Sequence, residues 1–233
     1  LNPLALLISK AKTTLLEKED FVCCENILQE ISNVEKNSDK IIKEFVDYVT
    51  KKYSIIEKGE WSSNADKITN DFFANTTLSK YKVKEIGNLG FWFRPESIIE
   101  IEIIKDIIDR LTTDNAKAFL YCTLSETIRL VSNTRNGEFK LYRKPVNTIL
   151  GKTHNPFHSF ILSLGKNLVK EKSYLPFASK NSHVKTICEN AQHLDSVKNG
   201  SIDIVITSPP YGDSHTTVAY GQYSRLSNTW LDL

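Results

Sequence analysis

A serine, two prolines and a tyrosine follow one another at residues 208–211. They come directly after an apolar, β-branched run at residues 202–206, whose composition predicts a buried strand that ends abruptly. Because consecutive prolines cannot donate an N–H and keep their neighbours extended, they hold the oxygen acceptors of Ser208 and Pro209 rigidly beside the Tyr211 ring. Such acceptors can bind the hydrogens of an amine and favour a pyramidal, more nucleophilic nitrogen, while the ring stacks on a flat base. This chemistry requires neither a metal nor a covalent intermediate.

The pentapeptide Thr-Ser-Pro-Pro-Tyr at residues 207–211 resembles the catalytic motif of the methyltransferases that modify exocyclic amines of DNA bases. The family pattern is Asp, Asn or Ser, then Pro-Pro, then an aromatic residue. The resemblance implies methyl transfer from S-adenosylmethionine, with Thr207 next to the cofactor and Ser208, Pro209, Pro210 and Tyr211 as catalytic residues. The serine form favours cytosine N4 over adenine N6. The alternative is a proline-rich turn after an ordinary strand, in which the tyrosine only packs.

Two further stretches resemble cofactor motifs of the same family. Asn2 and Pro3 are similar to the end of a motif whose acidic residue binds the cofactor ribose, and that acidic residue would precede residue 1. By the same resemblance, Asn190 stands at the strand tip that contacts the cofactor adenine; by itself it would cap the following turn. The glycine-rich turn of the family does not occur in this sequence. Its absence leaves open a companion polypeptide that supplies it.

The middle of the chain has the apolar spacing of helices. Residues 20–58 predict either a helical hairpin or one long bent helix, with Ser38 as a candidate cap at a break. Strong helical patterns follow at residues 96–111, 116–131 and 157–170. The isoleucine-rich pattern at 96–111 has a wide apolar surface, which predicts burial on more than one side.

These patterns predict an α/β fold: a partial Rossmann-like methyltransferase sheet with a large, mostly helical insertion. Residues 1–19 and 171–233 would belong to the catalytic domain, in which strands near residues 184–188 and 202–207 pair in parallel. Residues 20–170 would form the helical insertion and help to recognise DNA.

The most basic part of the sequence lies within this insertion, at residues 129–152. Its cations, with Tyr142 among them, suit contacts to phosphates and unstacked bases. The residues expected to contact DNA there are Arg135, Lys140, Arg143 and Lys144, and the resemblance adds His215 in the loop after the motif. The alternative is an exposed turn with ordinary surface cations. The net charge of the whole chain is only +2, so any nucleic-acid signal must be local.

Other features narrow the class of protein. The four cysteines lack metal-ligand spacing, which indicates a reducing, cytoplasmic location. His154 and His158 have the spacing of a helical metal pair, but no glutamate accompanies them and Pro156 lies between them, so no metal site is expected. No apolar run is long enough to cross a membrane.

The sequence therefore predicts a site-specific methyltransferase of double-stranded DNA, of the kind found in restriction-modification systems. Two alternatives remain: an RNA amino-methyltransferase, and a non-catalytic fragment or split subunit that binds DNA or a partner. Single-stranded and duplex substrates would distinguish the first alternative from the leading prediction.

Overall fold

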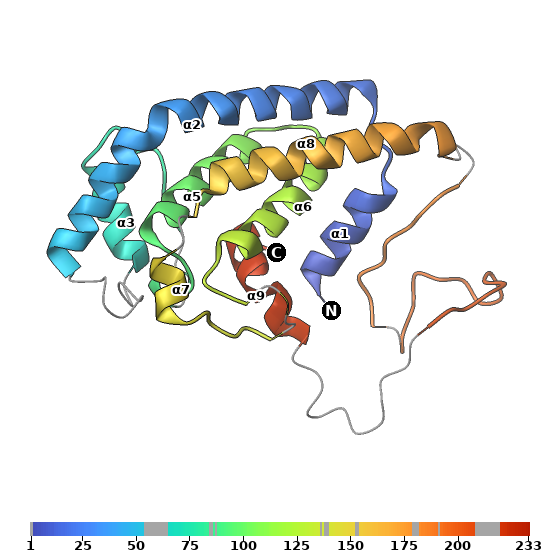
Figure 1. Cartoon of the computed structure of the whole chain (residues 1–233). Helices are drawn as coiled ribbons and strands as arrows, with labels where there is room; N and C mark the ends of the chain where they lie inside the picture. Colours follow the sequence, from blue (N-terminus) through green and yellow to red (C-terminus); the bar gives the residue numbers. More distant parts are fainter. Residues whose placement is uncertain are drawn as a thin grey trace.

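The computed structural model describes residues 2–53, 65–83, 86, 88–135, 137, 140–151, 154–178, 182–190, 192–207 and 220–233. Within these ranges the regular secondary structure is helical (Figure 1). The helices are α1 (Pro3–Thr13), α2 (Lys18–Tyr53), α3 (Ala65–Ala74), α4 (Leu89–Trp92), α5 (Pro95–Asp109), α6 (Asp114–Val131), α7 (Val146–Leu150), α8 (Pro156–Tyr174), the 3-10 turn η1 (Leu175–Phe177) and α9 (Tyr220–Leu231).

Helix α5 lies at the centre of the core. It begins at Pro95, whose fixed φ suits the first turn of a helix. Its isoleucines are buried around the whole helix, which confirms the predicted burial on more than one side: Ile98, Ile99, Ile101, Ile103, Ile104, Ile107 and Ile108. Helices α2, α6 and α8 surround α5, and α2 and α8 run side by side across one face (Figure 1).

Helix α2 is one continuous helix that bends along its length, so the bent-helix prediction is confirmed and the hairpin prediction is wrong (Figure 1). Ser38 is buried inside the helix and is not a cap, because its hydroxyl donates to the Glu35 carbonyl at 3.2 Å. Asn37 Nδ2 likewise donates to the Asn33 carbonyl at 2.7 Å. Bonds from side chains to the preceding turn let polar residues stay in a helix and favour bending.

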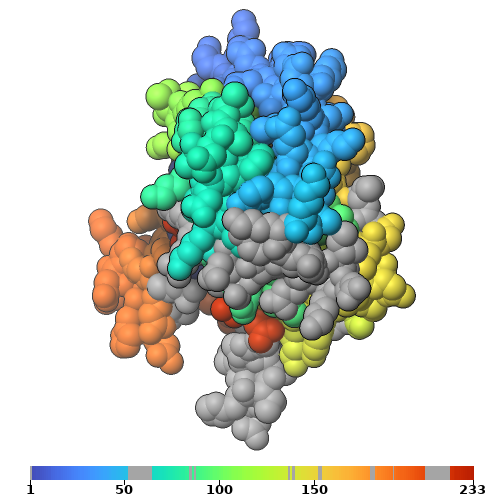
Figure 2. Space-filling view, turned by 90° about the vertical axis from the view of Figure 1, so that its left-hand side faces the viewer, coloured from blue at the N-terminus to red at the C-terminus, as the bar shows by residue number. Residues whose placement is uncertain are grey.

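The predicted Rossmann-like sheet is wrong for the residues that the structure describes. Their only ladder-type pairings are two isolated bridges, Thr134 with Arg143 and Asn190 with His193. The run expected to form a central strand is exposed instead: Ile202 by 56%, Ile204 by 76%, Val205 by 79% and Ile206 by 93%. Figure 2 shows the segment of residues 182–207, in orange, standing out at one side of the helical body. A strand needs a neighbour to bond its N–H and C=O groups, and none lies beside this run within the described ranges.

Helices α1 and α9 both pack against α6 and against each other. Leu226, Trp230 and Leu231 of α9 belong to the same apolar core as α2, α5 and α8. The division of the chain at residues 19/20 and 170/171 stays a prediction. Among the described residues, no helix combines the length and the apolar character that crossing a membrane requires.

Candidate cofactor and nucleic-acid site

Several of the predicted functional segments lie in the lower part of Figure 1: the starts of α1 and α9, the loop between α6 and α7, and part of the segment after α8. The contacts between them join them as two pairs. The backbone N–H of Leu141 in the loop donates to Gln222 Oε1 of α9 at 3.2 Å. A hollow of about 290 Å³ lies between α1 and the later segment, lined by Asn2, Ala5, Leu6, Ser9, Thr186, Ile187 and Cys188.

The predicted catalytic motif lies outside the described residues, as does His215. The described residues that flank this stretch are Thr207, which is exposed, and Tyr220, the first residue of α9. The roles of Ser208, Pro209, Pro210 and Tyr211 therefore stay predictions.

Asn2 and Pro3 form the start of α1. Pro3 occupies the first turn, and the Asn2 carbonyl accepts from the Leu6 N–H at 3.2 Å. The Asn2 side chain makes no capping bond and borders the hollow. Asn190 is exposed and caps a turn, since its Oδ1 accepts from the Gln192 N–H at 3.1 Å. It lies two residues beyond the lining of the hollow, and its contact with a cofactor stays a prediction.

The basic loop follows α6 and folds back on itself. Thr134 pairs with Arg143, and the Arg135 N–H donates to the Tyr142 carbonyl at 2.8 Å. Arg135 and Tyr142 are exposed near this turn, while Lys140 is half-buried. An exposed guanidinium and an exposed ring on the same turn are suited to a phosphate and a neighbouring base.

Two of the predicted DNA contacts also hold the loop in place. Arg143 Nε donates to the Phe91 carbonyl at 3.0 Å, and its guanidinium carbon lies 4.3 Å from the centre of the Phe91 ring. Lys144 Nζ donates to the Ser132 carbonyl at 2.8 Å. Both side chains are half-buried. The sequence shows their charge but not these bonds, which fix the loop to α4 and to the end of α6.

Sequence reasoning missed the pairing of Arg129 with Tyr223. The guanidinium carbon of Arg129 lies 3.5 Å from the centre of the Tyr223 ring, and its Nη1 donates to the Tyr223 carbonyl at 3.2 Å. Burial lowers the pKa of Arg129 from its ordinary value, and Tyr223 acts in the opposite direction. The sequence groups Arg129 with the basic stretch, because no local pattern links it to a tyrosine 94 positions away.

The two histidines of the His-Asn-Pro-Phe-His stretch do not share a site. His154 is buried, whereas His158 is exposed in the first turn of α8. Asn155 caps that helix by accepting from the His158 N–H at 2.8 Å. Across the described ranges, no group of three or more His, Cys, Asp or Glu side chains is arranged to hold a metal ion.

The chain is similar along its whole length to one curated protein. It is 34% identical over 239 residues to the Type II methyltransferase M.MvaI from Kocuria varians, and the alignment covers 100% of this chain and 45% of that protein. The chain therefore spans about half the length of the curated relative it matches. No protein-family model matches the chain. No solved structure matches it either.

Proposed function

We propose that this protein is an S-adenosylmethionine-dependent DNA methyltransferase that modifies an exocyclic base amine, with cytosine N4 favoured over adenine N6. The similarity to a Type II methyltransferase along the whole chain carries the proposal. The Thr-Ser-Pro-Pro-Tyr motif at residues 207–211 supports it and suggests the amine as the acceptor. A restriction-modification system is the proposed setting.

In the proposed reaction, oxygen acceptors of Ser208 and Pro209 hold the hydrogens of the base amine. Pro210 keeps these acceptors rigid, and Tyr211 stacks on the base after it has left the duplex. Positioning and fixed dipoles then supply the catalysis. His215 is proposed to line the base pocket, and Thr207 to lie next to the cofactor.

The hollow beside α1 fits part of a nucleoside-like cofactor. The Asn2 amide and the hydroxyls of Ser9 and Thr186 provide hydrogen-bonding groups, and Leu6 and Ile187 provide an apolar wall. S-adenosylmethionine would supply an electrophilic methyl group when bound. We propose that Asn2 and Pro3 hold one part of it and Asn190 another.

Double-stranded DNA is the proposed partner, and the basic loop is its proposed contact. Arg135 and Lys140 would bind phosphates directly. Arg143 and Lys144 would add positive charge and stabilise the fold of the loop. Each phosphate contact releases counterions, so binding through this loop depends steeply on salt concentration.

Replacing Arg135 by glutamine should flatten the salt dependence of DNA binding. We expect the slope of log K against log salt concentration to fall by about one, since one phosphate contact is lost. The thermal midpoint should change little, because Arg135 is exposed and the substitution keeps its backbone bond to the Tyr142 carbonyl. Arg143→Gln should flatten the slope and also lower stability by about 1–2 kcal/mol, because it removes the bond to the Phe91 carbonyl.

The measurement is fluorescence anisotropy of a labelled duplex at several salt concentrations. Lys43→Gln, which removes an exposed cation on α2, is the matched control and should leave the slope unchanged. An unchanged slope in Arg135→Gln and Arg143→Gln would remove this loop from the DNA footprint.

Mass analysis of nucleosides tests the proposed function. The protein is incubated with duplex DNA, single-stranded DNA or RNA and a labelled methyl donor, and the nucleosides are then separated. Labelled N4-methylcytosine from the duplex is the expected result. N6-methyladenine would change the proposed base, and label in RNA alone would favour an RNA methyltransferase. No labelled nucleoside from any substrate would overturn the proposal.

A further inference from the structure

A groove runs along α6 where α1 and α8 pack against it. Two adjoining hollows form it, of about 490 Å³ and 340 Å³, and both are lined by Lys12 of α1, Cys122 of α6, and Asn167 and Lys170 of α8. Such volumes are those of sites for small ligands. They are too small for a DNA duplex, whose major groove alone is about 12 Å wide.

The two walls of the groove each contribute a lysine. Lys12 and Lys170 are exposed, and neither takes part in an ion pair with another described residue. Burial raises the pKa of the Cys122 thiol, and Lys12 acts against this effect, which places its charge near the floor of the groove. Two cations on opposite walls thus face one shared space.

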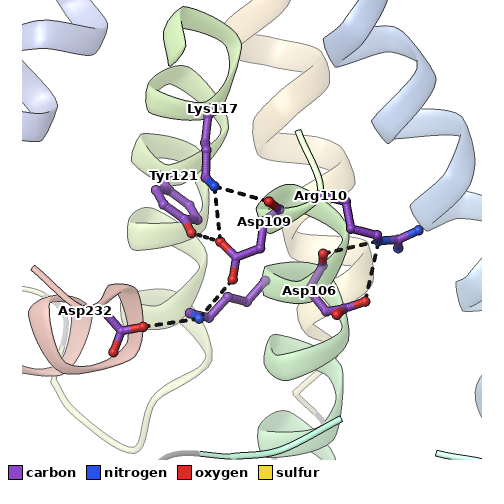
Figure 3. A network of polar contacts seen from close by, with 7 residues as sticks. Asp106, Asp109, Arg110, Lys117, Tyr121 and Asp232 are labelled. Carbon is purple, nitrogen blue, oxygen red and sulfur yellow. Dashed lines mark hydrogen bonds and ion pairs between the residues drawn. The ribbon is translucent and has the colours of Figure 1, made fainter. Parts of the chain in front are cut away.

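Elsewhere on α5 and α6, cations are paired with carboxylates of the chain. Lys105 and Lys117 lie 3.0 Å and 3.6 Å from the Asp109 carboxylate (Figure 3). Arg110 lies 3.5 Å from the Asp106 carboxylate in the same view. These charges are neutralised within the fold. The two lysines of the groove have no such partner, so their charge is available to an anion from outside the chain.

Two carboxylates also border the groove. Glu126 is exposed, and Glu171 is half-buried with its pKa raised by burial. Lys12, Lys170 and Arg129 outnumber them. The groove therefore has a small excess of positive charge, which suits a ligand that places one or two phosphates between the lysines.

An exposed tyrosine lies at each end of the groove. Tyr223 lines the larger hollow, and Tyr174, the last residue of α8, lines the smaller one. The Arg129 guanidinium, whose carbon lies 3.5 Å from the centre of the Tyr223 ring, holds that ring in place. A ring that is already fixed loses little freedom when a base stacks on it. Cations between exposed rings are suited to unstacked bases and the phosphates that join them.

The Tyr223 end of the groove lies next to the basic loop. Gln222, the residue before Tyr223, accepts the Leu141 N–H of that loop at 3.2 Å. We propose that the groove binds a short single-stranded segment of DNA, with phosphates at Lys12 and Lys170 and bases on the two tyrosine rings. The choice of DNA rests on the proposed function, whereas the binding of a single strand goes beyond it.

Fluorescence anisotropy of a labelled oligothymidylate at several salt concentrations tests the inference. Lys12→Gln and Lys170→Gln should each lower the slope of log K against log salt concentration by about 0.7, since one phosphate contact to a single strand is lost. Lys166→Gln removes an exposed cation one turn earlier on α8, outside the lining of both hollows. It is the matched control and should leave the slope unchanged.

Replacing Tyr174 by alanine should raise the Kd for the oligothymidylate by about tenfold, because one stacked base is lost. Tyr174→Phe keeps the ring and should stay within about twofold of the wild type. The Kd for a blunt duplex should change little in either variant, because the proposed duplex contact is the basic loop.

Alkylation of Cys122 provides a readout that does not depend on affinity. Its thiol is half-buried and lines both hollows, so bound oligothymidylate should slow its reaction with iodoacetamide, measured by mass spectrometry. Cys23 on α2 is also half-buried and is the internal control. It should react at the same rate with and without the oligonucleotide.

No binding of oligothymidylate by the wild-type protein at low salt would overturn the inference. So would unchanged slopes in both lysine variants, or binding that is lost in Arg135→Gln and kept in the groove variants, which would place the strand on the basic loop. Binding of oligouridylate without oligothymidylate would also overturn it. The failure of the proposed function looks different, since no nucleoside would then be labelled while these binding results would stand.

Discussion

Replacing Tyr211 by alanine should slow methyl transfer to duplex DNA by about 100-fold. Stacking of one base on an aromatic side chain contributes about 1–3 kcal/mol, and each 1.4 kcal/mol corresponds to a factor of ten in rate. We expect the whole of this free energy to appear as a lower rate of methyl transfer, because a base that is not held by the ring spends less time beside the methyl donor. The measurement is the single-turnover rate with a labelled donor and a duplex that carries the preferred site.

Two variants calibrate this result. Tyr211→Phe keeps the ring and should remain within a few-fold of the wild type. Ser208→Ala should lose about tenfold, since one neutral hydrogen bond contributes about 0.5–1.5 kcal/mol. All three variants should fold normally. Near-normal turnover of Tyr211→Ala on duplex DNA would show that the stacking role is wrong, whatever the fate of Ser208→Ala.

The helical body could be predicted because its signals are local. The isoleucines of α5 recur at helical spacing, and Pro95 marks its first turn. At the start of α8, Asn155 caps the helix and Pro156 follows it in the first turn. Spacing and caps act within one or two turns, so the sequence carries them in full. The prediction that Ser38 caps a helix is wrong for a related reason. A serine hydroxyl that can cap a helix can also donate to a carbonyl in the preceding turn of the same helix, as Ser38 does.

The sheet was predicted wrongly because pairing is not a local property. The β-branched side chains within residues 202–206 favour an extended backbone, but they do not determine whether another strand pairs with it. A strand also requires a neighbour with free N–H and C=O groups, and the described part of the chain places none beside Ile204 or Ile206. The composition predicts burial, whereas these two side chains are among the most exposed apolar residues that the structure describes.

The contacts of the candidate site could not be predicted from the sequence for the same reason. Charge alone indicated the loop around Arg135, and the structure adds that Arg143 is bonded to Phe91, 52 positions earlier. The stack of Arg129 on Tyr223 joins residues that are even further apart in the chain. A sequence without known contacts shows which residues carry charge, but not which charges also hold the fold together.

Burial of Glu100 should make the stability of the helical body fall as the pH rises. Burial, the largest cause, raises the pKa of Glu100 from 4.5 to about 8, and the nearby Glu96, Glu35 and Asp39 add to the effect. Between these values the folded protein keeps the carboxyl proton and the unfolded chain has lost it. The stabilisation is therefore complete below about pH 4.5 and is lost as the pH rises through about 8.

Glu100→Gln should remove this dependence. At pH 9 we expect its free energy of unfolding to exceed that of the wild type by an amount on the order of 4 kcal/mol, since a pKa difference of one corresponds to about 1.4 kcal/mol. At pH 4 the two proteins should be nearly equal, because a neutral carboxyl and an amide of the same shape both accept the Phe157 N–H. Urea denaturation across this pH range measures both quantities. Glu126→Gln, which changes an exposed glutamate on α6, is the matched control.

The hydrogen bond from the Phe157 N–H to Glu100 would explain the opposite result, in which Glu100→Gln does not stabilise the protein at pH 9. The Phe157 N–H lies in the first turn of α8 and donates to Glu100 Oε2 at 3.1 Å, and this bond lowers the pKa of Glu100 against the effect of burial. A helix start also favours a negative charge. If Glu100→Gln is no more stable than the wild type at pH 9, ionisation of Glu100 costs the folded protein no stability, and the carboxylate serves as an acceptor for the N–H of Phe157 in α8. Glu102, whose pKa burial raises to about 7 against the pull of Lys105, should then be the main source of any remaining pH dependence from α5.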